Sequence, residues 1–493
     1  MTRLQPGTGP AQSLTRSTLI GVSWLVFQNF GSRAIGFAAQ IVLAKILLPA
    51  DFGILAVATT VTTVIGVIAN FGVEDVLLQR PHSMRFWTRS AFIASLSLGI
   101  AGMLLVWAAA PLAAYAYAAP TLLTLLPLMA TAMPLTSLST VPAANLRAAL
   151  NFRFPALYGS MEMLLTQALT IALALAGFGV FSFAIPAPIA AAVRAIVFWS
   201  VTRPRLGPMR RRQLRMMGSN SAAVFGSRML TIMVGQGDYF VLGLLASKSV
   251  VGAYFFAFSL AIQPIRMIAG NFSTVLFPAF ANIRNDPVRQ TEAAVLASRI
   301  TAFTVLPYCF LQAAVAQPLL RLVFGEKWDA AIPLIEILSI GLGFDAVSWI
   351  AGALLQARGE FRRAFIYSMV FFPIFFLLVG TGAVLGTAVG VATAVSLFYL
   401  FLAPVYSFLV FRTSGVSLRT LAGIYLPPTL LSGFAIVAAR GLAAYLSLDS
   451  FATLLLTAIL GGGVYLVLAR LFVAEIYREI AQRLRHFLRD RGA

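Results

Sequence analysis

Charge is scarce in this chain of 493 residues, since only 11% of them are Asp, Glu, Lys or Arg. A soluble protein has about a quarter of its residues charged, so the low fraction excludes an ordinary soluble domain. The 60% hydrophobic content predicts instead an all-α integral membrane protein that crosses the bilayer many times.

Cysteine, lysine and histidine are also rare. The single cysteine, Cys309, allows no intrachain disulfide and lies in an apolar run, which argues against thiol or metal chemistry. His82 and His486 fall outside every apolar segment, and no Walker motif is present. We therefore expect no catalytic residues, no metal and no cofactor. A proton gradient, a sodium gradient and the membrane potential all stay open as driving forces.

Hydropathy windows of about 20 residues predict fourteen membrane spans. The glycine-rich breaks at 177–179 and 380–382 predict tight hairpins between two close pairs of spans. The first span is expected to remain uncleaved. The predicted spans are 19–43, 53–79, 87–110, 119–141, 155–177, 179–200, 217–245, 250–280, 299–323, 330–356, 364–382, 384–411, 420–439 and 450–472.

Basic residues are divided unequally between the two sides of these spans. With the N-terminus inside, the cytoplasmic segments hold 26 arginines and no lysine, whereas the outward loops hold only Lys45, Lys248, Lys327 and Arg440. The positive-inside rule therefore predicts that both termini are cytoplasmic. The net charge of +20 is explained by anionic lipid, and no nucleic-acid partner is needed.

The chain contains an internal repeat. Residues 31–33 and 226–228 both read Gly-Ser-Arg inside apolar stretches, and residues 146–153 match 355–362. Because six spans separate the copies, both have the same orientation, related by a pseudo-twofold axis along the membrane normal. The predicted organisation is an N-terminal tail (1–17), an N-lobe (18–200), a basic linker (201–216), a C-lobe (217–412), spans 13 and 14 (413–473) and a basic tail (474–493), which is either an amphipathic surface helix or solvated.

Four strings in the right order resemble motifs of one transporter family. They are the first-loop string Leu43 to Gly53, residues 235–243 followed by Gly252-Ala253-Tyr254, Phe277-Pro278-Ala279-Phe280, and Phe324-Gly325-Glu326-Lys327-Trp328. The chain resembles, over roughly residues 18–410, the polysaccharide-transporter (Wzx-like) flippases of the multidrug/oligosaccharidyl-lipid/polysaccharide superfamily. Lys45 stands where relatives often have arginine.

The resemblance implies a V-shaped bundle with two pseudo-symmetric six-helix lobes. It also implies a function: moving undecaprenyl-diphosphate-linked oligosaccharide units across the bacterial inner membrane for exopolysaccharide, capsule or O-antigen synthesis. A polymerase and a chain-length regulator are the implied functional partners. The alternatives are a cation-coupled multidrug exporter of the same superfamily, which would need an acidic cavity, and a membrane-embedded polymerase or ligase, which would need a long outward loop.

Four charged residues are predicted to share one layer of the membrane. A rise of 1.5 Å per residue places Arg33, Arg228, Arg266 and Asp345 about 16 to 21 Å from the cytoplasmic side. Guanidinium groups bind phosphate oxygens bidentately and stay protonated, so the arginines are candidate ligands for the diphosphate. The alternative is that they bond backbone carbonyls at helix breaks. Asp345 is either a coupling-ion carrier or a counter-ion to an arginine.

Other charges inside the spans have two interpretations each. Asp238 is a coupling candidate or a helix-packing residue, and its angular position predicts that it does not pair with Arg228. The pair Glu74-Asp75 is a gate or an interfacial cap. Glu162 and Arg194, on neighbouring spans, are expected to form a structural ion pair.

Overall fold

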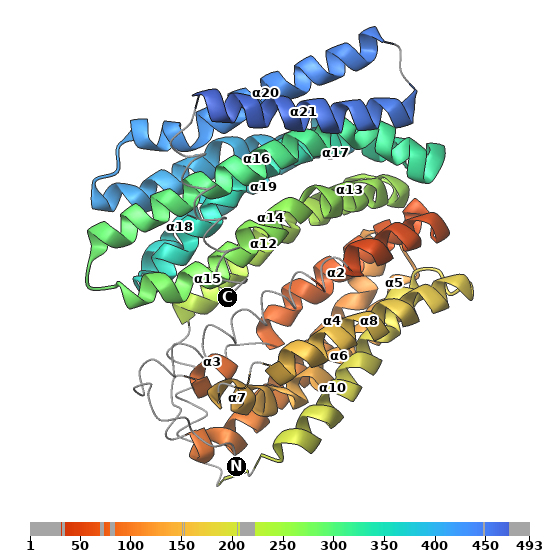
Figure 1. The fold of residues 1–493 in the computed structure, drawn as a ribbon. Coiled ribbons are helices and arrows are strands. Elements are labelled where there is room, and N and C mark those ends of the chain that lie inside the picture. Colours follow the sequence, from red (N-terminus) through yellow and green to blue (C-terminus); the bar gives the residue numbers. More distant parts are fainter. Residues whose placement is uncertain are drawn as a thin grey trace, which may run out of the picture. The chain divides into compact units, whose positions relative to one another are not determined.

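The computed structural model describes residues 31, 35–69, 73–78, 84–149, 151, 153–204, 206–207, 222–446 and 449–472. This part of the chain is helical and contains no strand, which confirms the predicted all-α class (Figure 1). It holds nine helical segments long and apolar enough to cross a membrane, or ten if one bent pair counts as a span. The predicted tails 1–17 and 474–493 and most of the predicted linker 201–216 lie outside the described residues.

The chain divides into two compact units, Met1–Ile232 and Met233–Ala493. In unit 1, an apolar helix Ile35–Ile46 precedes the labelled helices. These are α2 (Pro49–Ala69), α3 (Val73–Leu78), α4 (Met84–Ala116), α5 (Leu122–Ala130), α6 (Ala132–Leu138), α7 (Thr140–Ala148), α8 (Arg153–Leu175), α9 (Phe181–Ala184) and α10 (Pro186–Thr202). α4 is central, because α2, α5 and α6 all pack against it.

The glycines at 177–179 form the tight hairpin that the sequence predicts. α8 ends at Leu175 and α9 begins at Phe181. Between them, Gly177 and Gly179 adopt φ values of +85° and +53°, a left-handed conformation that glycine reaches without strain. α8 and the α9–α10 segment are therefore two separate helices joined by a short turn.

One loop recurs in both units at an offset of 199 residues. In unit 1 the helix ends at Ile46 and α2 begins at Pro49; the N–H of Leu47 donates to the carbonyl of Leu43 at 2.8 Å. In unit 2 the corresponding bond joins Ala246 to Leu242, also at 2.8 Å. The loop therefore closes each helix in the same way in both copies.

A second turn recurs at an offset of 209 residues, within the predicted match of 146–153 to 355–362. The N–H of Asn151 donates to the carbonyl of Leu146 at 3.0 Å, and that of Glu360 to Leu355 at 3.1 Å. Such a bond, spanning five residues, is the usual way to end a helix with an abrupt change of direction. The sequence repeat thus corresponds to a repeated backbone turn.

Unit 2 contains most of α12 and a larger set of helices. α12 (Ala222–Leu245) crosses the boundary between the units. The others are α13 (Lys248–Ala261), α14 (Gln263–Met267), α15 (Ala269–Asn282), α16 (Pro287–Phe324), the 3₁₀ segment η2 (Gly325–Ala331), α17 (Ile332–Gly343), α18 (Asp345–Ala357), α19 (Phe361–Phe411), η3 (Arg412–Ser414), α20 (Leu418–Tyr445) and α21 (Ser450–Phe472).

The hairpin predicted at 380–382 lies a few residues later. Residues 361–411 are helical except at Gly386 (φ −148°) and Thr387 (φ +51°), where the chain reverses. A Cβ on Gly382 would collide with the backbone of Gly390, so the two arms touch at their glycines. The predicted position was wrong because Gly382 serves close helix packing, while Gly380 lies in open space and the bend itself falls at Gly386.

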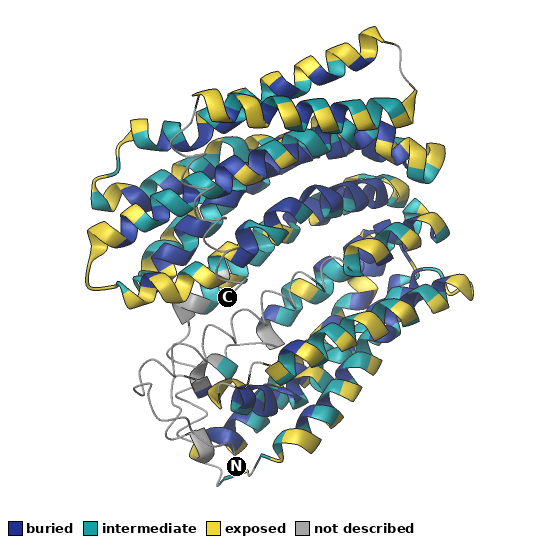
Figure 2. Ribbon diagram, viewed as in Figure 1, coloured by how far each residue is buried: buried dark blue, intermediate teal, exposed yellow. Residues whose placement is uncertain are grey.

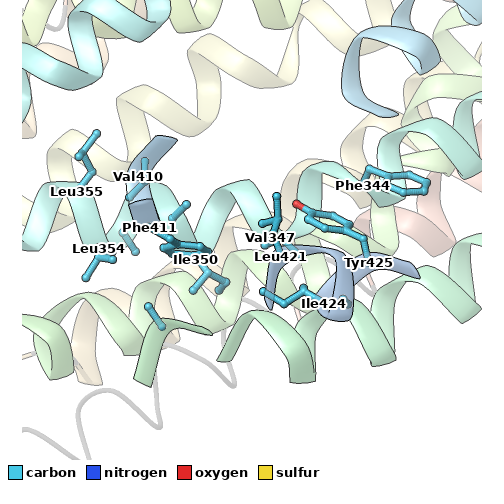
Figure 3. Close-up of a cluster of buried hydrophobic side chains, with 14 of the residues drawn as sticks. Phe344, Val347, Ile350, Leu354, Leu355, Val410, Phe411, Leu421, Ile424 and Tyr425 are labelled. Atoms are coloured by element: carbon cyan, nitrogen blue, oxygen red, sulfur yellow. The ribbon is translucent and has the colours of Figure 1, made fainter. Parts of the chain in front are cut away.

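Two features hold the core of unit 2 together. Figure 3 shows the first, a cluster of buried side chains that includes Phe344, Val347, Ile350 and Phe411 and joins α15, α16, α18, α19 and α20. The second is the guanidinium of Arg358. It donates to Thr291 Oγ1 at 2.6 Å, Gln290 Oε1 at 2.8 Å, Ser414 Oγ at 3.1 Å, Pro287 O at 3.2 Å and Thr413 Oγ1 at 3.4 Å.

α20 and α21, the predicted extra helices, pack on α16 (Figure 1). The hydroxyl of Tyr465 on α21 donates to the buried carbonyl of Phe303 at 2.9 Å. On α20, Arg440 lies 3.4 Å from Glu336 and 3.4 Å from the amide oxygen of Gln317. These bonds attach the last two helices to the body of unit 2.

Candidate functional site

A cavity of about 350 Å³ lies in unit 1. That volume falls at the low end of the roughly 300–1,000 Å³ typical of small-ligand pockets. Arg228 is the one ionisable group among the described residues around it. They are Thr62, Thr63, Gly66 and Val67 from α2, Met129 from α5, Ala132, Met133 and Thr136 from α6, and Arg228 and Ile232 from the first turns of α12.

Threonine hydroxyls and a glycine form the α2 side of the cavity. Thr62 Oγ1 donates to the carbonyl of Ala58 at 2.8 Å, so its lone pairs remain available as acceptors. Thr63 is exposed, and its hydroxyl bonds to no described residue. At Gly66, one turn beyond Thr62, a Cβ would make an ordinary contact of 3.9 Å with the methyl group of Met133.

The opposite wall comes from a span that is broken twice. α5 ends at Ala130, and the hydroxyl of the following residue, Thr131, donates to the carbonyl of Leu128 at 2.6 Å. The helical segment Leu122–Leu138 then bends by 42° relative to α7. The prolines Pro127 and Pro134 each remove a backbone donor, which favours these interruptions.

Arg228 extends from α12, and its side chain is exposed. It has no ion pair and no side-chain hydrogen bond to any residue that the structure describes. An unpaired guanidinium at the membrane depth predicted for Arg228 is costly unless it meets water or an anion. The wall of the cavity therefore carries one fixed positive charge with five N–H donors.

Of the two other arginines predicted to bind the diphosphate, only Arg266 lies within the described residues. Arg33 lies outside the described residues. Arg266 is exposed on α14, a five-residue segment between two helix interruptions in unit 2. Its guanidinium, like that of Arg228, bonds to no backbone carbonyl in the described part of the chain. In both cases the alternative expectation, a carbonyl-bonded structural arginine, is therefore not observed.

Asp345 forms no ion pair with any arginine in the described part of the chain. Its carboxylate accepts from the Ser348 hydroxyl and, at 2.8 Å, from the indole N–H of Trp349. Both donors lie on α18, of which Asp345 is the first residue. The helix itself thus supplies two donors to this carboxylate within one turn, and the coupling-ion and counter-ion roles both stay predictions.

Asp238 is buried, with 2% of its surface exposed. The hydroxyl of Tyr254 on α13 donates to its Oδ2 at 2.8 Å, and the N–H of Tyr239 donates to Oδ1 at 2.9 Å. No ion pair joins it to Arg228, in agreement with their predicted positions around α12. Asp238 thus links α12 to α13, whatever further role it has.

Of the remaining predicted charges, Glu74 forms an ion pair, whereas Glu162 and Arg194 do not pair with each other. Glu74 on α3 lies 3.1 Å from Arg147 on α7, while the side chain of Asp75 is outside the described part. Glu162 and Arg194 form no ion pair: the guanidinium of Arg194 lies instead over the ring of Phe198, 5.2 Å from its centre. The expected direct pair is absent because the aromatic ring one turn along α10 takes the cation.

Sequence reasoning missed the polar but uncharged lining of the cavity. The prediction considered only charged residues. In the cavity, Thr62, Thr63 and Thr136 contribute hydroxyls, and Met129 and Met133 contribute flexible apolar surface. The sequence did carry a signal, since residues 59–63 read Thr-Thr-Val-Thr-Thr inside an apolar span. No group of metal-ligating side chains occurs among the described residues.

The fold is that of a known superfamily of membrane transporters. The solved structure of the lipid II flippase MurJ in an inward closed conformation aligns with 92% of this chain and 99% of its own, with a TM-score of 0.74 and 16% identity. The MATE transporter VcmN of Vibrio cholerae, in its bent form, aligns with 83% of this chain and 100% of its own, with a TM-score of 0.55 and 14% identity. The chain is a multi-pass membrane protein with the fold of these transporters.

The chain belongs to the family described as "Polysaccharide biosynthesis protein", whose model matches residues 42–333. The succinoglycan biosynthesis transport protein ExoT of Rhizobium meliloti is 28% identical over 68% of this chain and 67% of its own length. The lipopolysaccharide biosynthesis protein WzxC of Escherichia coli is 22% identical over 77% and 78%. The resemblance to Wzx-like polysaccharide transporters is thus confirmed.

Proposed function

We propose that the protein translocates undecaprenyl-diphosphate-linked oligosaccharide units across the inner membrane for exopolysaccharide, capsule or O-antigen synthesis. The observation that carries the proposal is the unpaired guanidinium of Arg228 beside a cavity in a polysaccharide-transport family. A diphosphate needs a permanent, fork-shaped cation to enter hydrocarbon, and arginine supplies one. An exporter of cationic drugs would instead need an acidic cavity, and no acidic residue is among the described lining.

We infer fourteen spans for this protein. The candidate segment Pro287–Ala357 has 71 residues, far more than the roughly 20 that one span requires. It is interrupted by η2, and the helices on either side of that interruption, α16 and α17, pack against each other. The 51-residue α19 likewise folds back at Gly386. Dividing both segments, counting the bent pair and adding helix Ile35–Ile46 and α12 gives fourteen.

The proposed mechanism is alternating access by two lobes, 18–200 and 217–412, which rock about the linker 201–216. Arg33 and Arg266 would join Arg228 in binding the diphosphate. The two Gly-Ser-Arg strings are 195 residues apart, whereas the recurring loops are 199 apart. Arg228 is thus one helical turn farther from its loop than Arg33, which keeps both on nearly the same helix face.

The proposed driving force is an ion gradient or the membrane potential, with Asp238 and Asp345 as candidate coupling groups. The protein would act as a transporter and not as an enzyme, in line with the name of its relative, the succinoglycan biosynthesis transport protein ExoT. Cytoplasmic termini, the basic tail 474–493 and functional links to a polymerase and a chain-length regulator belong to the same proposal.

The test is complementation of a deletion strain. We expect the deletion to abolish polymer and to accumulate lipid-linked oligosaccharide. Two charge-assisted hydrogen bonds of about 1.5–3 kcal/mol each would be lost in Arg228→Ala, so transport should fall at least about 100-fold. Arg228→Lys keeps the charge but not the fork, and should retain partial activity.

Arg470→Ala, which changes an exposed arginine on α21, is the matched control and should complement fully. The proposal is wrong if the deletion strain still makes its polymer without accumulating the intermediate. The site assignment is wrong if Arg228→Ala complements at normal expression.

A further inference from the structure

Three polar side chains gather on the paired helices α8 and α10 of unit 1. Tyr158 and Glu162 lie one turn apart on α8, and Arg194 lies on α10, which packs against α8. Glu162 is about 13 Å from the start of α8, and Arg194 about 12 Å from the end of α10. Those two helix ends are on the same side, because the hairpin at 177–179 joins the opposite ends.

None of the three side chains has its hydrogen bonds satisfied within the described structure. Glu162 and Arg194 lie close enough to interact electrostatically with each other and with Tyr158, yet no ion pair or hydrogen bond joins the three side chains. Arg194 lies over Phe198, and its Nε is buried without a partner. The group therefore presents guanidinium donors, carboxylate acceptors and a hydroxyl that can do both.

These groups must meet something polar. A carboxylate or guanidinium facing lipid tails costs about 2.5–3.5 kcal/mol at the centre of a span even on the mildest scale. α8 is one of the more exposed helices (Figure 2), and Tyr158, Glu162 and Arg194 are all partly exposed. Since their own contacts leave them unpaired, the space beside them is expected to hold water or a hydrogen-bonding ligand.

We propose that Tyr158, Glu162 and Arg194 form a glycan subsite that binds the sugar hydroxyls of the transported lipid-linked oligosaccharide. A sugar offers adjacent hydroxyls that donate to a carboxylate and accept from a guanidinium, which matches this mixed set. A phosphate would be repelled by Glu162, so the subsite differs in chemistry from the cavity at Arg228. This inference rests on the proposed function, and it assigns the recognition of sugar and of diphosphate to different residues.

The test compares two lipids on the full-length protein in zwitterionic nanodiscs. One is synthetic undecaprenyl diphosphate without sugar, and the other is the lipid-linked oligosaccharide extracted from cells that lack the transporter. Dissociation constants are measured by microscale thermophoresis for the unchanged protein and for Glu162→Gln, Tyr158→Phe and Arg228→Ala. Met161→Leu changes a neighbouring exposed side chain without altering polarity, and serves as the matched control.

We expect Glu162→Gln to weaken binding of the oligosaccharide lipid at least about tenfold and Tyr158→Phe about threefold to tenfold. Both should bind the sugar-free lipid as the unchanged protein does, whereas Arg228→Ala should weaken both lipids. Equal effects of Glu162→Gln on the two lipids, or none on either, would overturn the glycan subsite and indicate packing or contact with lipid headgroups instead. If the unchanged protein binds neither lipid, the proposed function fails, and the subsite fails with it.

Discussion

Arg358 is expected to be the most sensitive polar position in unit 2. Replacing it with alanine removes all five of its donated hydrogen bonds. The amide oxygen of Gln290, a residue only 1% exposed, then loses its donor inside the protein. An acceptor left unpaired in this way costs about 1–3 kcal/mol, and the partly exposed bonds add about 0.5–1 kcal/mol each. We expect a total loss of about 3 kcal/mol.

The assay is thermal unfolding of the purified protein in detergent, followed by the loss of its monodisperse chromatography peak. A loss of about 3 kcal/mol corresponds to a fall of roughly 6–10 °C in melting temperature for a unit of this size. Arg358→Lys should lose about half as much, because one ammonium cannot reach every acceptor. Gln290→Leu combined with Arg358→Ala should cost less than the sum of the two changes. A melting temperature within about 1 °C of the parent for Arg358→Ala would refute the reasoning.

Three further changes follow from the structure. Gly382→Val places a side chain against the returning arm of α19, so we expect little folded protein on size-exclusion chromatography, whereas Gly380→Ala, with open space around it, should behave as the parent. Tyr254→Phe removes a donor from buried Asp238 and should destabilise the protein by about 1–3 kcal/mol in thermal unfolding. Glu74→Gln breaks an ion pair whose side chains are 28% and 52% exposed, so we expect a loss under about 1 kcal/mol; a larger loss would contradict the surface character of that pair.

The fold could be predicted from sequence wherever apolar length and glycine determine the structure. The hairpin at Gly177 and Gly179 was found because two glycines there take left-handed conformations that other residues avoid. The bend of α19 was misplaced because glycines also occur where helices touch, and sequence alone does not distinguish the two uses. The difference is a matter of contact: Gly382 meets Gly390, while Gly386 has open space around it.

The site was harder to predict than the fold. The predicted depth of residues in the membrane singled out Arg228, which lines the cavity, because arginine is rare inside a membrane span. It could not show that Asp345 is satisfied by Ser348 and Trp349 on its own helix, since such bonds depend on side-chain rotamers. Nor could it separate the expected ion pair of Glu162 from the aromatic contact that Arg194 makes instead.

The attachment of α20 and α21 to α16 has a consequence for the order in which the protein is made. α16 leaves the ribosome more than a hundred residues before α21, yet the buried carbonyl of Phe303 is bonded by Tyr465. Glu336 and Gln317 likewise acquire Arg440 only when α20 has been synthesised. Until α20 and α21 are synthesised, the carbonyl of Phe303 and the side chains of Glu336 and Gln317 lack these partners, whether they lie beside the insertion machinery or in lipid. A ribosome that stalls before the final hairpin would therefore release an immature protein that quality-control proteases can recognise.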